Sequence, residues 1–316
     1  MLTRIDPLAE ARGRLVGLDD PAAPVTAPVI VACSGGPDST ALLALVADRG
    51  LAPIAVHVDH GLRDGSADET DAVRALAAAL GTAFDARRVD VGHGGNLEAR
   101  ARAARYTTLD TAADDHGASA VLVGHTADDQ AETVVLALLR GSAASGLAGM
   151  AVRRDRIVRP LLRLRRAETE AICVGLGLEP VRDPSNDDVS LRRAWVRHAV
   201  LPFLSIGAER DLVPVLTRQA DVLRTESEFL DALARAAWPP APGAAPAAPL
   251  ARLPLALARR AVRCWLGAPP PSFDEVERVL AVARGEARAT ELAGGRHVRR
   301  SGGDLLLTGP AVACPP

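Results

Sequence analysis

The sequence predicts an α/β fold: an open, doubly wound, mostly parallel sheet, followed by a smaller, mainly helical C-terminal domain that ends in a β-hairpin. Three observations predict this fold. Between residues 28 and 124, short apolar runs alternate with alanine-rich segments of helical period. A turn with two glycines joins the first apolar run to the first helical segment. Beyond residue 141 the alternation ends, and a glycine- and arginine-rich stretch precedes further helical patterns.

Each apolar run of the first part has the length and composition of a β-strand. The predicted strands are Val29–Cys33, Pro53–Val58, Ala83–Val89 and Ala120–Val123. The predicted helices are Ser39–Ala47, Ala67–Leu80, Leu97–Asp115 and Ala127–Leu139. Strand–helix–strand units of this kind build parallel sheets, and ligands of such sheets lie at the carboxyl ends of the strands.

The second part of the chain is predicted to be mainly helical. Its helical patterns lie at Ala167–Gly175, Leu191–Leu204, Asp211–Ala236, Leu255–Leu266 and Phe273–Ala283. Pro239–Pro249 is almost entirely proline, alanine and glycine, which predicts a linker or surface loop. Gly302 and Gly303 mark the turn of the final hairpin. We therefore predict two domains, over residues 1–204 and 205–316.

The composition excludes several classes of protein. All 37 basic residues are arginines, so a Walker A loop and a pyridoxal phosphate Schiff base, which both need lysine, are excluded. The four cysteines, Cys33, Cys173, Cys264 and Cys314, lie far apart and form no Cys-x-x-Cys pair, as is typical of reduced thiols. The N-terminus is charged, and no apolar run reaches the roughly 18 residues of a membrane span. We expect a soluble, cytoplasmic protein that does not enter a membrane.

Charge is unevenly distributed along the chain. Residues 1–150 contain 12 arginines against 20 acidic residues, a net charge of −8, whereas residues 151–316 contain 25 against 19, a net charge of +6. A polyanion would prefer the second half. The arginines cluster at residues 153–166, 192–197 and 296–300. On charge pattern alone, each cluster is equally typical of a solvated helix face.

The first predicted strand runs directly into Ser34-Gly35-Gly36-Pro37-Asp38-Ser39. The glycines allow the backbone to approach a ligand closely, and the free N–H groups at the start of the next helix attract phosphate. A glycine turn by itself is also a common structural connection in α/β folds. The full pattern Ser-Gly-Gly-x-Asp-Ser, however, resembles the PP-loop of the ATP pyrophosphatase families, which cleave ATP between the α and β phosphates and adenylate an acceptor.

Further motifs narrow the resemblance to one of the families that share this loop. They are His57-Val58-Asp59-His60-Gly61-Leu62-Arg63, Asn96-Leu97-Glu98-Ala99-Arg100-Ala101-Arg102-Ala103-Ala104-Arg105-Tyr106, Gly124-His125-Thr126-Ala127-Asp128-Asp129-Gln130-Ala131-Glu132-Thr133, Arg159-Pro160-Leu161-Leu162 and Asp183-Pro184-Ser185-Asn186. In residue type and spacing they are similar to the signature set of the tRNA(Ile)-lysidine synthetases, as is Arg193 with Arg197 ahead of Pro202. The resemblance covers roughly residues 28–204.

The resemblance implies the adenine nucleotide α-hydrolase-like version of the fold and a two-step reaction. The O2 of the wobble cytidine in a CAU-anticodon isoleucine tRNA attacks the α phosphate of ATP, and pyrophosphate leaves. The amine of free L-lysine then displaces AMP at C2. Magnesium is expected on the pyrophosphate. Residues 1–204 would bind ATP and catalyse, and residues 205–316 would bind tRNA or substrate. The oligomeric state stays open, with a homodimer among the options.

The resemblance also assigns site residues. Those implied to bind ATP are Ser34, Gly35, Gly36, Pro37, Asp38, Ser39, His57, Gly124 and His125. Asp38, Arg102 and Arg105 are implied to be catalytic, and Asp38 would bind magnesium or position the reacting base. Asp129 and Glu132 are implied to bind lysine. Arg193 and Arg197 are implied to bind tRNA.

Each assignment has a structural alternative. Arg102 and Arg105 share a helix face, which suits a phosphate clamp but also a solvated surface. Asp129 and Glu132 are either a pocket for an amine or caps of their helix, and Asp38 would likewise serve as a helix cap. The histidines, without accompanying metal ligands, either line the nucleotide site or are simply packed.

The sequence departs from the family pattern at two places, and two other functions are possible alternatives. The chain has Arg193-Ala194 where the family usually shows Arg-Asn, and its C-terminal portion is shorter than in the longest members. A tRNA thiolase with the same loop would need catalytic or cluster-binding cysteines, but Cys33 is predicted to be buried and the other three lie outside the motifs. A non-catalytic RNA-binding protein would show a degraded loop, whereas Asp38, Asp129 and Glu132 are all present.

Overall fold

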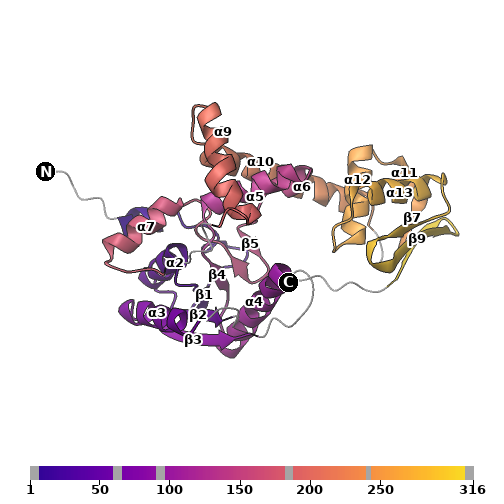
Figure 1. The fold of residues 1–316 in the computed structure, drawn as a ribbon. Coiled ribbons are helices and arrows are strands. Elements are labelled where there is room, and N and C mark those ends of the chain that lie inside the picture. The colour runs from indigo at the N-terminus through magenta and orange to yellow at the C-terminus, as the bar shows by residue number, and fades with distance from the viewer. Residues whose placement is uncertain (1–6, 60–65, 90–96, 182–187, 240–242, 310–316) are drawn as a thin grey trace. The chain divides into compact units, whose positions relative to one another are not determined.

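The computed structural model describes residues 7–59, 66–89, 97–181, 188–239 and 243–309 (Figure 1). The chain divides into two compact units, Met1–Val222 and Leu223–Pro316. The division falls within helix α10 (Val213–Ala237), whereas the sequence analysis places a boundary after residue 204. Each unit has a hydrophobic core of its own.

A six-stranded sheet forms the centre of the first unit. Its strands are β1 (Val29–Ala32), β2 (Pro53–Asp59), β3 (Ala83–Arg88), β4 (Val121–Val123), β5 (Arg153–Arg154) and β6 (Ile157–Val158). Their order is β3-β2-β1-β4-β6-β5, and every pair is parallel except β5 with β6. The chain runs outward from β1 to β3 and then returns to the other side of β1 as β4. The gap between the carboxyl ends of β1 and β4 is therefore the topological switch point, where ligands of such sheets bind.

Helices cover both faces of this sheet, as the sequence predicts. The helical segments of the first unit are α1 (Pro7–Arg12), α2 (Pro37–Asp48), α3 (Ser66–Ala79), α4 (Leu97–Asp115), α5 (Ala127–Leu139), α6 (Ala144–Leu147), α7 (Arg166–Gly175), α8 (Arg192–Trp195), the π-helical turn η2 (Val196–Val200) and α9 (Leu201–Gly207). Alternate residues of β1 enter two different cores: Val31 packs in one core with Leu42 of α2, and Ile30 packs in the other with Leu109 of α4. This alternation confirms the doubly wound arrangement.

The second unit combines helices with a four-stranded antiparallel sheet. Its elements beyond the end of α10 are β7 (Ala244–Pro246), α11 (Ala247–Arg252), α12 (Leu255–Leu266), α13 (Phe273–Arg284), β8 (Ala289–Leu292), the 3₁₀ turn η3 (Ala293–Gly295), β9 (Arg296–Ser301) and β10 (Asp304–Thr308). The sheet order is β7-β10-β9-β8. The predicted hairpin is confirmed as β9 and β10, and both turn glycines have positive φ (60° and 96°).

The linker predicted over Pro239–Pro249 is wrong for its described C-terminal part. Residues 244–246 form β7, which pairs with β10, and α11 begins at Ala247. Backbone pairing with β10 supplies the order that the small side chains do not predict. Pro249 lies in the first turn of α11, where its missing N–H removes no intrahelical bond.

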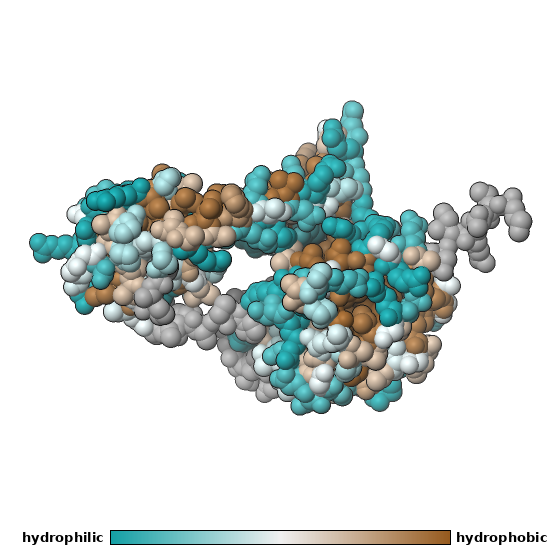
Figure 2. Space-filling model, turned by 180° about the vertical axis from the view of Figure 1, so that it is seen from behind, coloured by the Kyte–Doolittle hydropathy of each residue, from teal (hydrophilic) through white to brown (hydrophobic). Residues whose placement is uncertain are grey.

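Large apolar side chains are not all enclosed. On the face that Figure 2 shows, apolar residues surface as separate patches between polar ones. Exposed examples include Phe203 and Ile206 of α9, at 75% and 78% exposure. Within the described ranges, no helix is both long enough and apolar enough to cross a membrane.

Candidate active site

The loop between β1 and α2 has the conformation expected of an anion-binding turn. Gly35 has a φ of 83°, which L side chains rarely adopt, and a Cβ there would lie 2.9 Å from Val181. Ser39 ties the loop to its helix, because its hydroxyl donates to the carbonyl of Gly36 at 3.0 Å and accepts from the backbone N–H of Ser34 at 3.3 Å. Helix α2 begins at Pro37 with no side-chain cap. Its first N–H groups therefore stay available to a ligand.

The end of β4 packs directly against this turn. A Cβ at Gly124 would lie 3.0–3.1 Å from backbone atoms of Asp38 and Ser39, so only glycine permits this approach. His125 follows, and its Nδ1 atom is buried with no hydrogen-bond partner among the described residues. Burial lowers the pKa of His125 to about 3, and the positive charges of nearby arginines add to the effect. The ring is therefore neutral near pH 7.

His57 of β2 also lies at this end of the sheet, but it is buried. Its Nδ1 lies 3.0 Å from the carbonyl oxygen of Cys33 and donates to it, which leaves Nε2 as the other ring atom available for contacts. Cys33 is buried at the end of β1, as predicted. The histidine ring thus helps to fix the strand from which the loop departs.

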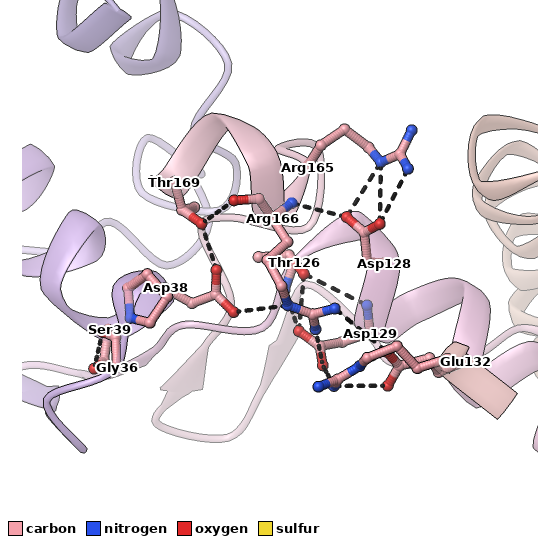
Figure 3. Close-up of polar contacts among 12 residues, drawn as sticks. Gly36, Asp38, Ser39, Thr126, Asp128, Asp129, Glu132, Arg165, Arg166 and Thr169 are labelled. Carbon is pink, nitrogen blue, oxygen red and sulfur yellow. Dashed lines mark hydrogen bonds and ion pairs between the residues drawn. The ribbon is translucent and has the colours of Figure 1, made fainter. Parts of the chain in front are cut away.

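Asp38 does not cap its own helix. Its carboxylate accepts a short hydrogen bond from the Thr169 hydroxyl of α7 and lies 3.5 Å from the Arg166 guanidinium (Figure 3). Burial raises the pKa of Asp38 to about 6, against the opposing effects of Thr169 and Arg166. The carboxylate is therefore mostly ionised at neutral pH, and it stands beside the turn that the sequence predicts to hold phosphates.

Asp129 uses its two carboxylate oxygens differently. Oδ2 accepts from the backbone N–H of Thr126 at 2.8 Å and from its hydroxyl at 2.9 Å, which completes a capping box at the start of α5. Oδ1 faces the arginines: Arg166 lies 3.3 Å away. Although burial alone would raise it, the positive charges of Arg166 and Arg193 lower the pKa of Asp129. Asp129 thus caps its helix through Oδ2 and keeps Oδ1 as a buried acceptor that faces the arginines.

Glu132 lies beside Asp129 on α5, and its side chain is only 1% exposed. Arg197 donates to Glu132 at 2.7 Å and Arg193 donates to it at 3.0 Å, while Arg166 lies 3.6 Å away. Arg193 and Arg197 are also 3.8 and 3.9 Å from Asp129. Three guanidiniums therefore surround two buried carboxylates, which satisfies the rule that buried charges are paired.

The arginines of α4 form a second basic group on the other side of the switch point. The Arg102 guanidinium lies 5.0 Å from the centroid of the Tyr106 ring, and burial lowers the pKa of Arg105. Arg159 is buried with its Nε unpartnered among the described residues, and its pKa is lowered by burial as well. Arg105 interacts electrostatically with both Cys33 and His125, which brings it to the carboxyl ends of β1 and β4.

The structure brings most of the predicted residues to one place, and it adds others. Arg166 and Thr169 contact the carboxylate of Asp38, and Arg159 lies near Arg102 of α4. The sequence analysis assigns none of these three residues to the site. Two of the three, Arg159 and Arg166, belong to the arginine cluster at residues 153–166, which could have indicated them. His60, Gly61, Leu62, Arg63, Asn96 and the motif Asp183–Asn186 lie outside the described residues.

Comparisons with known proteins show the family to which this chain belongs. Residues 18–204 match the PP-loop domain family, and residues 246–306 match the TilS substrate binding domain. A tRNA(Ile)-lysidine synthase of Thermobifida fusca is 43% identical over 298 residues, which cover 89% of this chain and 91% of that protein. A tRNA(Ile)-lysidine synthase of Salinispora tropica is 42% identical over 322 residues, or 95% of each chain.

Among solved structures, the fold is similar to that of the U34-tRNA thiolase NcsA of Methanococcus maripaludis. The TM-score is 0.55 at 16% sequence identity, over 69% of this chain and 78% of the thiolase. At that identity the likeness extends to the fold alone.

Proposed function

The chain belongs to the tRNA(Ile)-lysidine synthase family, and from this premise we propose that it ligates free L-lysine to C2 of the wobble cytidine in the CAU-anticodon isoleucine tRNA, releasing AMP and pyrophosphate. The observation that carries the proposal is the meeting, at one switch point, of a phosphate-binding turn and a buried acidic pair. The turn can bind the phosphates of ATP, and the acidic pair can bind the amine of lysine.

ATP is proposed to bind with its phosphates on the turn from Ser34 to Ser39. Free N–H groups at the start of α2 would face the phosphates, and the neutral His125 beside them adds no charge. Arg102 and Arg105 supply positive charge from α4. Adenylation of the cytidine O2 needs no protein nucleophile, so catalysis rests on positioning and on stabilising the negative charge of the phosphates.

Asp38 is the proposed magnesium ligand, and its chemistry fits that role. Magnesium prefers oxygen ligands and is usually held by one or two carboxylates together with substrate phosphates. Among the described residues, no group of three acidic, histidine or cysteine side chains is arranged around a metal, so phosphate oxygens and water would complete the coordination. When bound, magnesium would neutralise the charge of the departing pyrophosphate.

Asp129 and Glu132 are the proposed acceptors for the lysine substrate. The contacts that arginines make to Asp129 Oδ1 are 3.3–3.9 Å long, whereas Glu132 is held at 2.7 Å and 3.0 Å. Asp129 Oδ1 is therefore the acceptor that an ammonium group captures at least cost. The positive charges of Arg166 and Arg193 favour the ionised form of Asp129 before the substrate arrives.

Arg193 and Arg197 are proposed to contact tRNA with the donors that Glu132 does not use. Each binds the glutamate through Nε, and Arg197 also uses Nη2, which leaves other N–H groups of each fork for a phosphate. Each of the two arginines would then contact Glu132 and a tRNA phosphate at the same time. The second unit, which contains the region matched to the substrate binding domain, would supply further contacts.

A tRNA thiolase remains the rival function. Its chemistry requires reactive thiols, but burial raises the pKa of Cys33, and it raises that of Cys173 to about 11. Both thiols are therefore poor nucleophiles at neutral pH, and the geometry of the described residues does not favour the rival.

The proposal is tested by measuring pyrophosphate release from ATP with the isoleucine tRNA, with and without lysine. Stoichiometric formation of AMP and lysine-bearing tRNA is expected. Pyrophosphate leaves before lysine attacks, so the first turnover needs no lysine. Repeated turnover without lysine, with no lysine-bearing tRNA formed when lysine is added, would refute the proposal.

A further inference from the structure

A cavity of about 320 Å³ lies in the first unit, on the far side of α5 from the acidic pair. Ala127 and Gln130 of α5 line it, whereas Asp129 and Glu132 do not. Its other walls come from the segment after α1, the β6–α7 connection and the first turns of α10. The cavity and the candidate active site share the β6–α7 connection: Arg165 lines the cavity, and the next residue, Arg166, contacts Asp38.

The walls of this cavity are of two kinds. One part is apolar, with Val16, Val152 and Leu162, and the other part contains four arginines. Two of the four are already neutralised. Arg14 pairs with Glu168, and Arg165 binds Asp128 at 3.0 Å, as Figure 3 shows, and also pairs with Asp211.

Arg163 and Arg218 are different. Both side chains are exposed, and neither has an acidic partner among the described residues. One wall residue, Asp221, is acidic, and it has an interaction of its own. The cavity wall therefore carries two arginines outside any ion pair with a described residue, next to an apolar surface. A ligand that fits must combine an anion with a flat or apolar body.

We propose that this cavity binds one nucleotide of the tRNA substrate, with its phosphate on Arg163 and Arg218 and its base against the apolar wall. The inference rests on the proposed function, which brings single-stranded RNA to the neighbouring site. Loop nucleotides of RNA are recognised in this way: unstacked bases enter pockets, and arginines hold their phosphates. A volume of about 320 Å³ lies in the range of small-ligand sites.

The first test replaces both arginines. Arg163→Ala with Arg218→Ala should weaken binding of the isoleucine tRNA about tenfold, the effect of losing one charge-assisted contact. It should lower the slope of log affinity against log salt by about one. The KM values for ATP and lysine should not change. The control is Arg88→Ala with Arg140→Ala, which removes the same charge from exposed positions outside the cavity. An equal loss in both double variants would overturn the proposal.

A second variant tests shape without changing charge. Thr217→Trp places an indole in the cavity, and Thr217→Val keeps its size as the control. The tryptophan variant should weaken tRNA binding while the valine variant does not, with both melting near the wild-type temperature. If the tryptophan variant, folded as judged by melting, binds tRNA as well as the wild type, the cavity does not hold a nucleotide.

A free mononucleotide would present the same chemistry as a nucleotide of the tRNA. AMP is therefore titrated into the wild type and the arginine double variant without tRNA. If the cavity is a tRNA site, AMP binds mainly at the ATP site, and equal AMP affinities are expected. A loss of AMP binding with tRNA binding intact would overturn the tRNA assignment. Because tRNA binding is measured without catalysis, failure of this inference is separate from failure of the proposed function, which would appear as a wild type without lysine-dependent pyrophosphate release.

Discussion

At the scale of single residues, the site is a balance of buried opposite charges. Asp38, Asp129 and Glu132 face arginines that come from α7, α8 and the π-helical turn η2. Glu132, with a side chain only 1% exposed, would be strongly disfavoured as an isolated ion. Removing one partner from such a group leaves its counterpart uncompensated, so substitutions must be compared by substrate dependence and by stability together.

Asp38→Asn is expected to abolish pyrophosphate release while the protein stays folded. The amide keeps the size of the side chain but loses the charge that would bind magnesium. The measurement is pyrophosphate release together with thermal melting. Near-wild-type release by a folded variant would show that Asp38 is only a structural partner of Thr169.

Asp129→Ala or Glu132→Ala is expected to raise the lysine concentration needed for half-maximal rate more than the ATP concentration. Loss of either acid removes an acceptor for the substrate ammonium and leaves the surrounding arginines to repel it. Steady-state kinetics with each substrate varied is the measurement, and Asp71→Ala, at an exposed acid of α3, is the control. An unchanged lysine requirement with a worsened ATP requirement would place these acids at the metal site instead.

The residues that the sequence predicts are those whose partners lie near them in the chain or in a recognisable motif. The loop from Ser34 to Ser39 and the pair Asp129 and Glu132 are of this kind. Thr169 could not be found this way, because its contact with Asp38 joins two helices that are distant in sequence. The sequence also could not predict that Arg193 and Arg197 pair with Glu132. An arginine cluster such as residues 192–197 is equally typical of a solvated helix face.

At the scale of elements, capping boxes built from a hydroxyl side chain and an acid begin α5 and α13 among the described helices. Thr126 and Asp129 begin α5, and Ser272 and Glu275 begin α13 in the second unit. The first box belongs to the candidate site, so its capping acid also faces the arginines of that site. The second is purely structural: Glu275 accepts from the backbone N–H groups of Ser272 and Ala293, both at 2.7 Å.

Ser272→Ala is expected to destabilise the second unit by about 1 kcal/mol, the usual value of a helix N-cap. The measurement is urea unfolding of the full chain followed by tryptophan fluorescence. Trp238 and Trp265 of this unit pack edge to face with ring centroids 5.6 Å apart, so their emission reports on its core. Ser272→Asp keeps a capping oxygen and is the control; equal destabilisation by both variants would contradict the capping role.

Glu275 also makes this stability depend on pH. Hydrogen bonds from the backbone of Ala293 and Ser272 lower its pKa below the ordinary value. A carboxyl with a lowered folded-state pKa stabilises the fold above its unfolded-state pKa, and this stability is lost as pH falls through the folded-state value. Unfolding free energies of the wild type should therefore approach those of Glu275→Gln as the solution is acidified below about pH 4.5, the ordinary glutamate range. A constant difference between them would contradict this role.

Long helices were predicted well, and short elements were not. The predicted limits of α4, α5 and α12 coincide with the observed ones. Strands β5 and β6 have two residues each, too few to produce a period, and β7 exists because β10 pairs with it. Local pattern predicts an element only where the element is long enough to bury a face of its own.

At the scale of the whole molecule, the uneven charge of the sequence does not follow the two units. Arg193 and Arg197 belong to the basic half of the sequence but to the first unit, where they pair with Glu132. In the C-terminal cluster, Arg296 is buried and donates to the carbonyl of Leu266 at 2.9 Å, which removes it from the surface that could meet RNA.

Replacing Arg193 and Arg197 by alanine is expected to weaken tRNA binding and to flatten its salt dependence by about one unit of log–log slope per lost phosphate contact. Binding of ATP alone should hardly change. The measurement is tRNA affinity across a salt series for wild type and double variant. Parallel slopes with equal affinity would show that the two arginines serve only to neutralise Glu132.

The central claim, that the chain joins lysine to a tRNA cytidine, is tested most directly by the mass of the modified nucleoside. Isoleucine tRNA with a CAU anticodon is incubated with the protein, ATP, magnesium and isotopically labelled lysine, and is then digested to nucleosides. The account predicts a labelled nucleoside whose mass is that of cytidine plus lysine less one water, at the wobble position, formed only with ATP. An unmodified wobble cytidine, or a label found anywhere else in the tRNA, would contradict it.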